Sequence, residues 1–490
     1  MAHVDLSVDL LPGERVQITL ESDPGDGGVR VTRETSRKSL AESRPKTRRG
    51  SLSQVDAQQF LKSSLARFSI ISPERLFWAG LLVYLLVRLV GITVFPIYFS
   101  PDEAVQPLLA SKLLTNGLRD DFGELLPTFF KNGGQYSLGL SVYFHALPVL
   151  LFGRSIWVTR ASVALCSLLA AFWTARISRV YLRLDNWWLA PLALSILPAW
   201  FLLTRVGFEY ALMVTFYSGF LFFYLRYRLE DAKYLFAALT LGALTFYSYF
   251  PGQVIMLATG AGLLLSDARY HWRHRRLALA GLAMLILLAL PLLRFQLAHP
   301  LEYVNRLDAF NAYLVQDIRF SAKLGNFLGH YLSGLNPLYW FLPNEADPVM
   351  YRMSGFAHLT VILLPAAAAG IGLAVRRWRQ PETRLALIAL LAAPVGGAVV
   401  GLTVQRALTI VIPATLVSLM ALDAGAARLE KQVGFPRSVL HLALLIAFSL
   451  ANVITLADAL VRGPTWHGDY GIGGLQWGAR EVYAAVREIN

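Results

Sequence analysis

The sequence predicts an all-α integral membrane protein with about eleven transmembrane helices. Of its 490 residues 55% are hydrophobic and only 16% are charged, and the mean hydropathy is +0.48. A soluble domain carries about 25% charged residues, so this chain has too few to coat soluble globules of its length. A single cysteine, Cys166, excludes an internal disulfide and a cysteine cluster for zinc or iron–sulfur.

The chain divides by composition into three parts. Residues 1–66 are polar and basic, and we expect a mostly disordered cytoplasmic tail there, with short strands only at 17–20 and 29–31. No apolar core follows the first residues, so no signal peptide is expected. The polytopic membrane domain is predicted over 67–456, followed by a short extracytoplasmic tail at 457–490.

Eleven apolar segments approach the length that a bilayer requires, which is about 20 residues per helix. An odd number of spans places the two termini on opposite sides of the membrane. The predicted spans are 76–98, 156–177, 187–204, 210–226, 234–250, 252–267, 277–295, 357–375, 385–403, 407–423 and 438–456.

The charges between these spans predict the orientation. With the N-terminus inside, every short inside loop has at least three basic residues, whereas the short outside turns hold only Arg205 and Arg406. This positive-inside pattern predicts a cytoplasmic N-terminus. It also accounts for the net charge of +13 through contact with membrane lipid, so no nucleic-acid partner is expected. The Arg- and Ala-rich composition and the expected lack of a signal peptide fit a bacterial plasma (inner) membrane.

Two outside segments, about 99–155 and 296–356, are long enough to be functional. In the first, 103–114 and 136–152 are predicted as helices that lie on the membrane surface. The helix at 136–152 is apolar enough to span. A span there would reverse the side of every later loop and break the charge pattern.

Acidic residues follow the first span and open the fourth on the outer side. Asp102 and Glu103 lie at the interface, where a carboxylate can accept a proton from an acceptor hydroxyl. The alternative is that they favour the N-terminus of the next helix electrostatically. Glu209 shares a short turn with Arg205, and it could orient an acceptor or hold a metal ion. Arg205 could meet a phosphate, or it could form a local ion pair at the interface.

Outer-face cations are candidates for binding a phosphate. Lys131 precedes the flexible segment 132–134, which suits an anion. Arg406 breaks the orientation bias, so it is a candidate for neutralising a departing lipid phosphate, with an interface anchor as the alternative. Arg160, near the outer end of its span, is a candidate for substrate binding, although we favour structural pairing with the first outer loop.

The outer turn at 247–253 is aromatic. Tyr247 and Tyr249 belong either to an aromatic belt at the headgroup level or to the wall of a sugar or lipid groove.

Together these features resemble the C-type (GT-C) membrane glycosyltransferases, in particular the protein O-mannosyltransferase and aminoarabinose transferase branch (family 39 or related), which uses lipid-phosphate-linked sugars. The segments that carry the resemblance are Pro101-Asp102-Glu103-Ala104, Leu126-Pro127-Thr128-Phe129-Phe130-Lys131, Phe152-Gly153 followed by Arg160, and Thr204-Arg205-Val206-Gly207-Phe208-Glu209. The resemblance implies that Asp102 is the catalytic base with Glu103 beside it. It also implies that Glu209 is the second acidic residue, where the family more often has aspartate, and that Lys131 lies near the donor phosphate.

The sequence thus predicts a glycosyltransferase for a hexosyl or pentosyl group. It would move one sugar from a polyprenyl-phosphate carrier to a hydroxyl of a protein, lipid or glycan on the extracytoplasmic face, with inversion. No cofactor is certain, and a divalent cation at Asp102 and Glu209 stays open. The alternatives are a transporter or flippase of lipid-linked sugars, and a non-catalytic subunit of cell-envelope glycan assembly.

Overall fold

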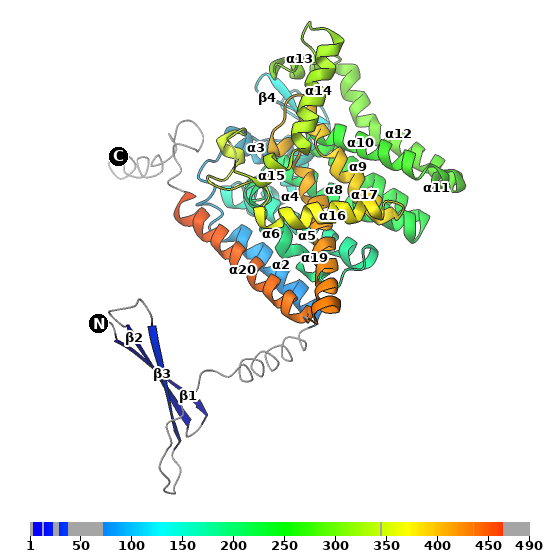
Figure 1. Cartoon of the computed structure of the whole chain (residues 1–490). Helices are drawn as coiled ribbons and strands as arrows, with labels where there is room; N and C mark the ends of the chain where they lie inside the picture. The colour runs from blue at the N-terminus through cyan, green and yellow to red at the C-terminus, as the bar shows by residue number, and fades with distance from the viewer. Residues whose placement is uncertain are drawn as a thin grey trace, which may run out of the picture. The chain divides into compact units, whose positions relative to one another are not determined.

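The computed structural model describes residues 3–11, 14–22, 29–37, 72–343, 345–434 and 436–463 (Figure 1). The chain forms two units, Met1–Ser63 and Ser64–Asn490, and each is described by itself. Most of the predicted tail at 457–490, from 464 onward, lies outside the described residues.

The first unit contains an antiparallel sheet in the order β1-β2-β3, with β1 at His3–Leu11, β2 at Glu14–Ser22 and β3 at Val29–Arg37. The expectation of a mostly disordered segment is wrong for these strands. Valine, isoleucine and threonine recur along them, and these residues favour extended backbone. The two short segments expected as strands lie inside β2 and β3, and the basic stretch at 38–66 falls outside the described residues.

The second unit is helical, and a helix or helix pair overlaps each predicted span. Ten of these segments contain one main helix and the eleventh is broken. The single helices are α2 (Pro73–Leu89), α5 (Ile156–Arg176), α8 (Glu209–Leu229), α9 (Leu235–Ser248), α10 (Phe250–Ser266), α12 (Arg275–Ala298), α16 (Leu364–Arg376), α17 (Pro381–Ala392), α19 (Val411–Val433) and α20 (Arg437–Val461).

The predicted span at 187–204 is interrupted. It consists of α6 (Ala190–Ser195) and α7 (Pro198–Leu203), because Pro198 has no amide hydrogen to continue the preceding helix. Every residue of α6 and α7 is buried, so this broken pair lies in the core. Among the described residues, four helices have the length and composition to cross a membrane alone, at Ile156–Tyr181, Arg275–Ala298, Leu408–Val433 and Arg437–Val461.

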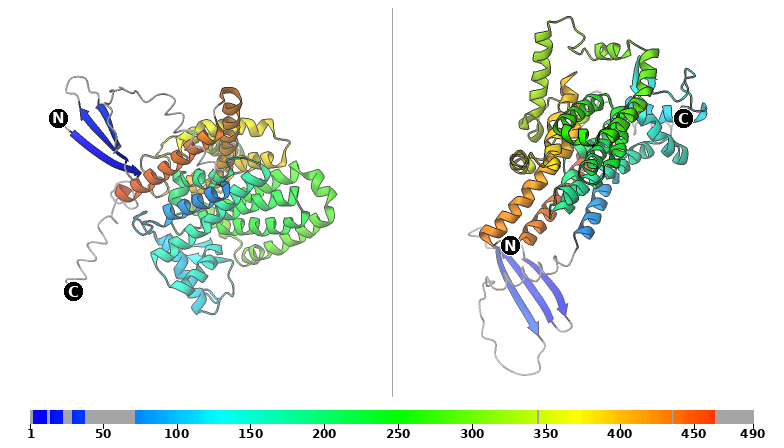
Figure 2. Two further views of the ribbon diagram at one scale, coloured as in Figure 1. Left: turned by 90° about the horizontal axis from the view of Figure 1, so that it is seen from below. Right: turned by 90° about the vertical axis from the view of Figure 1, so that its right-hand side faces the viewer.

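The helices pack around this core in two groups. Helices α8, α9, α10 and α12 stack side by side, as the green ribbons of Figure 2 show. The second group consists of α2, α19 and α20, which pack against α6. Helix α5 connects the two groups, because it contacts both α6 and α8. The fold is therefore the mostly helical membrane architecture that the sequence predicts.

The first outer segment contains α3 (Pro101–Thr115) and α4 (Leu140–Phe152), close to the two predicted surface helices. Between them lies a hairpin that the sequence analysis missed, with β4 at Phe129–Asn132 and β5 at Gln135–Leu138. Gly133 has a φ of +61°, which suits the two-residue turn that joins them. Because the hairpin extends to Leu138, α4 begins at Leu140 and not at the predicted residue 136.

The second outer segment contains α13 (Glu302–Ala309), α14 (Phe320–Leu335) and α15 (Pro337–Phe341). It meets the hairpin of the first, because Tyr303 makes an edge contact with the ring of Phe129, at 6.2 Å between centres, and Arg306 Nη1 donates to the Tyr136 carbonyl at 2.8 Å. Figure 1 shows α3, β4, α13 and α14 toward one end of the helical unit.

Candidate functional site

The two acidic residues in the first turn of α3 differ in their exposure. The Ser100 hydroxyl caps the helix by accepting a hydrogen bond from the Glu103 amide at 3.1 Å. Asp102 is exposed, whereas the Glu103 side chain is fully buried. Asn132, at the end of β4, donates from Nδ2 to Asp102 Oδ1 at 3.4 Å. Of the two acids, Asp102 is therefore the one that can reach a substrate.

Glu103 belongs to the framework, in contrast to its predicted catalytic role. Arg160 donates from Nε to Glu103 Oε1 at 2.8 Å and from Nη2 to Oε2 at 3.1 Å, and the Gly207 amide donates to Oε1 at 2.7 Å. Both carboxylate oxygens thus accept charge-assisted or amide hydrogen bonds in a buried place. The ion pair joins α3, α5 and the turn before α8.

Arg160 likewise has no capacity left for a substrate. Besides Glu103, it donates to the carbonyls of Ile92, Pro96 and Tyr98 at 2.7–2.9 Å. The structure bears out the structural pairing with the first outer loop and assigns no substrate-binding role to this side chain.

Arg205 is also placed differently from the prediction of a phosphate ligand. Its buried guanidinium donates to the carbonyls of Val87, Arg88, Val90 and Phe95 at distances from 2.6 to 3.1 Å. The last carbonyls of a helix lack partners inside it, and a cation there is favoured by the helix dipole. Arg205 therefore caps the C-terminal end of α2.

Arg205→Met should reduce stability and not donor affinity. The variant leaves several buried carbonyls without a donor, and each costs about 1–3 kcal/mol. We expect a lower folded yield and a lower melting temperature in detergent, whereas the exposed Arg154→Met should match the wild type. A wild-type melting temperature combined with a specific loss of donor affinity would overturn this assignment.

Glu209 lies near two other charged side chains, those of Asp102 and Arg306. It is the first residue of α8, ahead of the predicted span at 210–226, and it is partly exposed. Its Oε2 atom is buried and has no hydrogen-bond partner among the described residues. Burial raises the pKa of the Glu209 carboxyl to about 7, and the charge of Asp102 adds to this effect while its own amide and Arg306 oppose it. The site would therefore favour additional positive charge.

Arg306 lies near Glu209, and Arg406 lies near Arg306. Arg306 of α13 holds its guanidinium 3.8 Å from the ring centre of Phe250. Arg406 ends the short helix η6 (Val404–Arg406) and donates from Nη1 to the Gly401 carbonyl at 2.9 Å. The two positive charges repel each other. Both arginines also lie close enough to Tyr249 to interact electrostatically with its hydroxyl.

Tyrosine rings surround these charges. Tyr249 and Tyr351 both make edge contacts with the ring of Tyr210, at 6.1 and 6.2 Å between centres. Tyr351 ends the short helix η4 (Val349–Tyr351), and it is close enough to feel the charges of Glu209 and Asp102. Tyr249 and Tyr351 thus lie close to the charged groups of Glu209 and Arg406.

Tyr247 and Lys131 do not join this cluster. The Tyr247 hydroxyl donates to the Leu288 carbonyl of α12 at 2.7 Å, so it packs against a neighbouring helix. Successive residues of a strand face opposite ways, so Lys131 points away from the side on which Asn132 meets Asp102. Its Nζ lies 5.2 Å from the ring centre of Phe122.

Arg306, Tyr351 and Asn132 are not among the residues that the sequence pattern predicts for the site. Arg306 had a usable signal, because it is a cation in a segment predicted to lie outside, after the predicted span at 277–295, and so departs from the predicted charge bias as Arg406 does. We define the acid–arginine cluster as Asp102, Glu209, Arg306, Arg406, Tyr249 and Tyr351.

The cluster has a limited capacity for a metal ion. The described residues contain no group of three or more His, Cys, Asp or Glu side chains placed to hold one. Asp102 and Glu209 supply two carboxylates, and the unpartnered Oε2 of Glu209 is the atom that a cation would satisfy. This set fits Mg²⁺, which is often bound by one or two carboxylates with water and substrate phosphate completing its shell.

Comparison with solved structures places the fold. ArnT from Cupriavidus metallidurans bound to undecaprenyl phosphate matches with a TM-score of 0.52 and 16% identity over 80% of this chain and 78% of that one. The Archaeoglobus fulgidus oligosaccharyltransferase AglB, solved with an inhibitory peptide and a dolichol-phosphate, matches with a TM-score of 0.52 and 14% identity over 82% of this chain and 58% of that one. Its complex with Zn and sulfate gives a TM-score of 0.52, 14% identity, and 82% and 56% coverage.

No protein-family model and no curated protein match the sequence. The chain nevertheless has the fold of the GT-C membrane glycosyltransferases, which confirms the resemblance drawn from its sequence. The chain spans little more than half of the oligosaccharyltransferase that it matches.

Proposed function

We propose that this protein is an integral membrane glycosyltransferase that moves one sugar from a polyprenyl-phosphate carrier to a hydroxyl acceptor. The observation that carries the proposal is the acid–arginine cluster, in which exposed Asp102 lies near Glu209, Glu209 lies near Arg306, and Arg306 lies near Arg406. The solved structures of the same fold support the carrier class, since one is bound to undecaprenyl phosphate and another to a dolichol-phosphate.

In this mechanism Asp102 is the general base. Its carboxylate accepts the proton of the acceptor hydroxyl as that oxygen forms a bond to the anomeric carbon. The bond from the anomeric carbon to the phosphate oxygen breaks on the opposite face, so the sugar inverts and the phosphate leaves with the electron pair. Asn132 orients Asp102 through its side-chain amide.

Arg306 and Arg406 stabilise the leaving phosphate, whose negative charge grows in the transition state. Their mutual repulsion is relieved when an anion binds between them, so the pair is matched to a phosphate. A divalent cation held by Asp102 and Glu209 would supply further positive charge for this phosphate.

The proposed location is a plasma membrane, with the N-terminus in the cytoplasm and the cluster on the extracytoplasmic side. Asp102, Glu209, Arg306 and Arg406 come from four segments that the charge pattern places outside, and they gather in one cluster. Their proximity supports the assignment of these segments to one side of the membrane.

The test is sugar transfer by the purified protein in a non-glycosidic detergent, with a radiolabelled polyprenyl-phosphate sugar as donor. A glycosyltransferase releases polyprenyl phosphate and labels the acceptor. A flippase moves the intact carrier across a liposome without cleaving it, and an assembly subunit does neither. An intact donor after incubation with protein, acceptor candidates and Mg²⁺ would count against the proposal.

Arg306→Ala and Arg406→Ala should each lower kcat/KM by about 100-fold, because each removes positive charge facing the leaving phosphate. The measurement is the initial rate of polyprenyl phosphate release at several donor concentrations. Arg319→Ala, an exposed arginine of the same outer segment, is the matched control and should keep the wild-type rate. Unchanged kinetics in both cluster variants would remove the arginines from the mechanism.

A further inference from the structure

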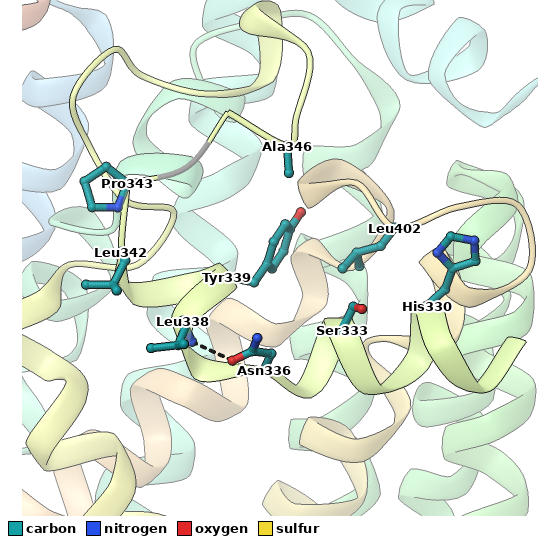
Figure 3. Close-up of a pocket in the computed structure, with 9 residues that line it drawn as sticks. All are labelled: His330, Ser333, Asn336, Leu338, Tyr339, Leu342, Pro343, Ala346 and Leu402. Atoms are coloured by element: carbon teal, nitrogen blue, oxygen red, sulfur yellow. Dashed lines mark hydrogen bonds between the residues drawn. The ribbon is translucent and has the colours of Figure 1, made fainter. Parts of the chain in front are cut away.

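A second feature lies beside the cluster, in the part of the chain that carries α14 and α15. It is an open cavity of about 540 Å³, within the range of small-molecule sites, about 300–1,000 Å³. Figure 3 shows the ring of Tyr339 in the middle of the view, with Leu402 and His330 on one side, Leu342 on the other, and Ser333 and Asn336 below.

The lining of this cavity is mixed, with more apolar than polar residues, and its described residues include no aspartate, glutamate, lysine or arginine. His330, Ser333 and Asn336 carry hydrogen-bonding groups and Tyr339 contributes its ring, while the other lining residues are apolar: Leu338, Leu342, Pro343, Ala346 and Leu402. An anion would require cationic partners, and among the described lining residues there is no lysine or arginine, whereas the cluster has Arg306 and Arg406. Uncharged donors and acceptors beside an aromatic ring suit a neutral, hydroxyl-rich ligand that also presents apolar C–H surface.

A buried carboxylate holds the walls of the cavity. Asp347 Oδ2 accepts from the Tyr339 hydroxyl at 2.8 Å and lies 2.8 Å from His358 Nε2, and Oδ1 accepts from the Val404 amide at 2.7 Å. These contacts tie α15 to the loop that leads to Tyr351 and to the helix that ends at Arg406. The orientation of the cavity is therefore fixed relative to two members of the acid–arginine cluster.

The cavity and the cluster share a short segment of backbone. Leu402 lines the cavity, and the carbonyl of its neighbour Gly401 accepts a hydrogen bond from Arg406. A ligand in the cavity thus lies next to the segment that carries the phosphate-facing arginine.

We propose that this cavity binds a neutral saccharide and serves as the acceptor subsite. The acceptor role rests on the proposed glycosyltransferase function, and the shared segment at Gly401 and Leu402 links the cavity to Arg406 of the cluster. The binding of a neutral saccharide stands without that function. The substrate class that follows is a glycan acceptor, in preference to a peptide or an anionic lipid headgroup.

Binding is tested on the full chain in a non-glycosidic detergent by saturation-transfer NMR. The probes are maltotriose, mannotriose and the charged trisaccharide trigalacturonate. Ser333→Trp fills the cavity, and Ser321→Trp, an exposed serine of the same helix outside the cavity lining, is the matched control. We expect a neutral trisaccharide to bind, with affinity reduced at least tenfold in Ser333→Trp and unchanged in Ser321→Trp.

The binding proposal is overturned if neither neutral trisaccharide gives a signal, if Ser333→Trp leaves the signal unchanged, or if trigalacturonate binds better. The acceptor role has a separate measurement, which is the KM for the saccharide in sugar transfer. Ser333→Trp should raise this KM at least tenfold and leave the KM for the donor unchanged. If the wild type binds the saccharide but never cleaves the donor, the proposed function fails while the binding site survives.

Discussion

Asp102→Asn should lower kcat by at least about 100-fold, the lower limit of what a general base contributes. The amide has nearly the same shape as the carboxylate but cannot accept the acceptor proton. Because Asp102 is exposed and the hydrogen bond that it accepts from Asn132 is long, at 3.4 Å, the substitution should leave the fold intact. Donor binding should also be kept, since the phosphate faces Arg306 and Arg406.

The measurement is single-turnover release of polyprenyl phosphate, together with the melting temperature and the donor affinity of each variant. Asp121→Asn is the matched control, because Asp121 is an exposed acid of the same outer segment and pairs with Lys112 at 2.6 Å. It should turn over at the wild-type rate. Wild-type-like turnover by Asp102→Asn would remove the base from the mechanism.

The composition of the cluster shows what hydropathy and charge can predict. The spans and the positive-inside pattern assign each loop to one side of the membrane, and this assignment selected Asp102, Glu209, Arg406 and Tyr249 from four separate segments. The structure brings these residues together. The predicted side narrowed the candidates, because several turns that are predicted to lie outside come together in the fold.

Neighbouring residues show what could not be predicted. Asp102 is exposed and Glu103 buried, Asn132 meets the aspartate and Lys131 points away, and Tyr249 joins the cluster while the Tyr247 hydroxyl binds α12. Each outcome depends on the rotation of a helix or strand about its own axis. The hydropathy of a segment predicts how deep a residue lies in the membrane. It does not predict how the helix or strand is rotated about its own axis.

The buried arginines were misassigned for a different reason. The backbone after α2 is irregular, and its carbonyls at Ile92, Phe95 and Pro96 must find donors where little water is available. Arg160 and Arg205 provide those donors. The sequence predicts which cations lie on the outer side. It does not predict that their N–H groups already donate hydrogen bonds to backbone carbonyls.

Arg160→Met should cause the largest loss of stability, about 3–5 kcal/mol, which is typical when one partner of a buried ion pair is removed. The variant leaves the Glu103 carboxylate buried without its cation and deprives the Ile92, Pro96 and Tyr98 carbonyls of their donors. We expect little folded protein at 37 °C. The measurement is the melting temperature in detergent, monitored by fluorescence-detected size exclusion.

Glu103→Gln separates a structural role from a catalytic one. Glutamine keeps an acceptor for the Gly207 amide and for one Arg160 donor, so the variant should fold with a lowered melting temperature. Its kcat per folded molecule should remain within a few-fold of the wild type, since Glu103 is buried and saturated by these contacts. A loss of 100-fold in kcat at an unchanged melting temperature would instead assign Glu103 to the chemistry, as its place beside Asp102 first implied.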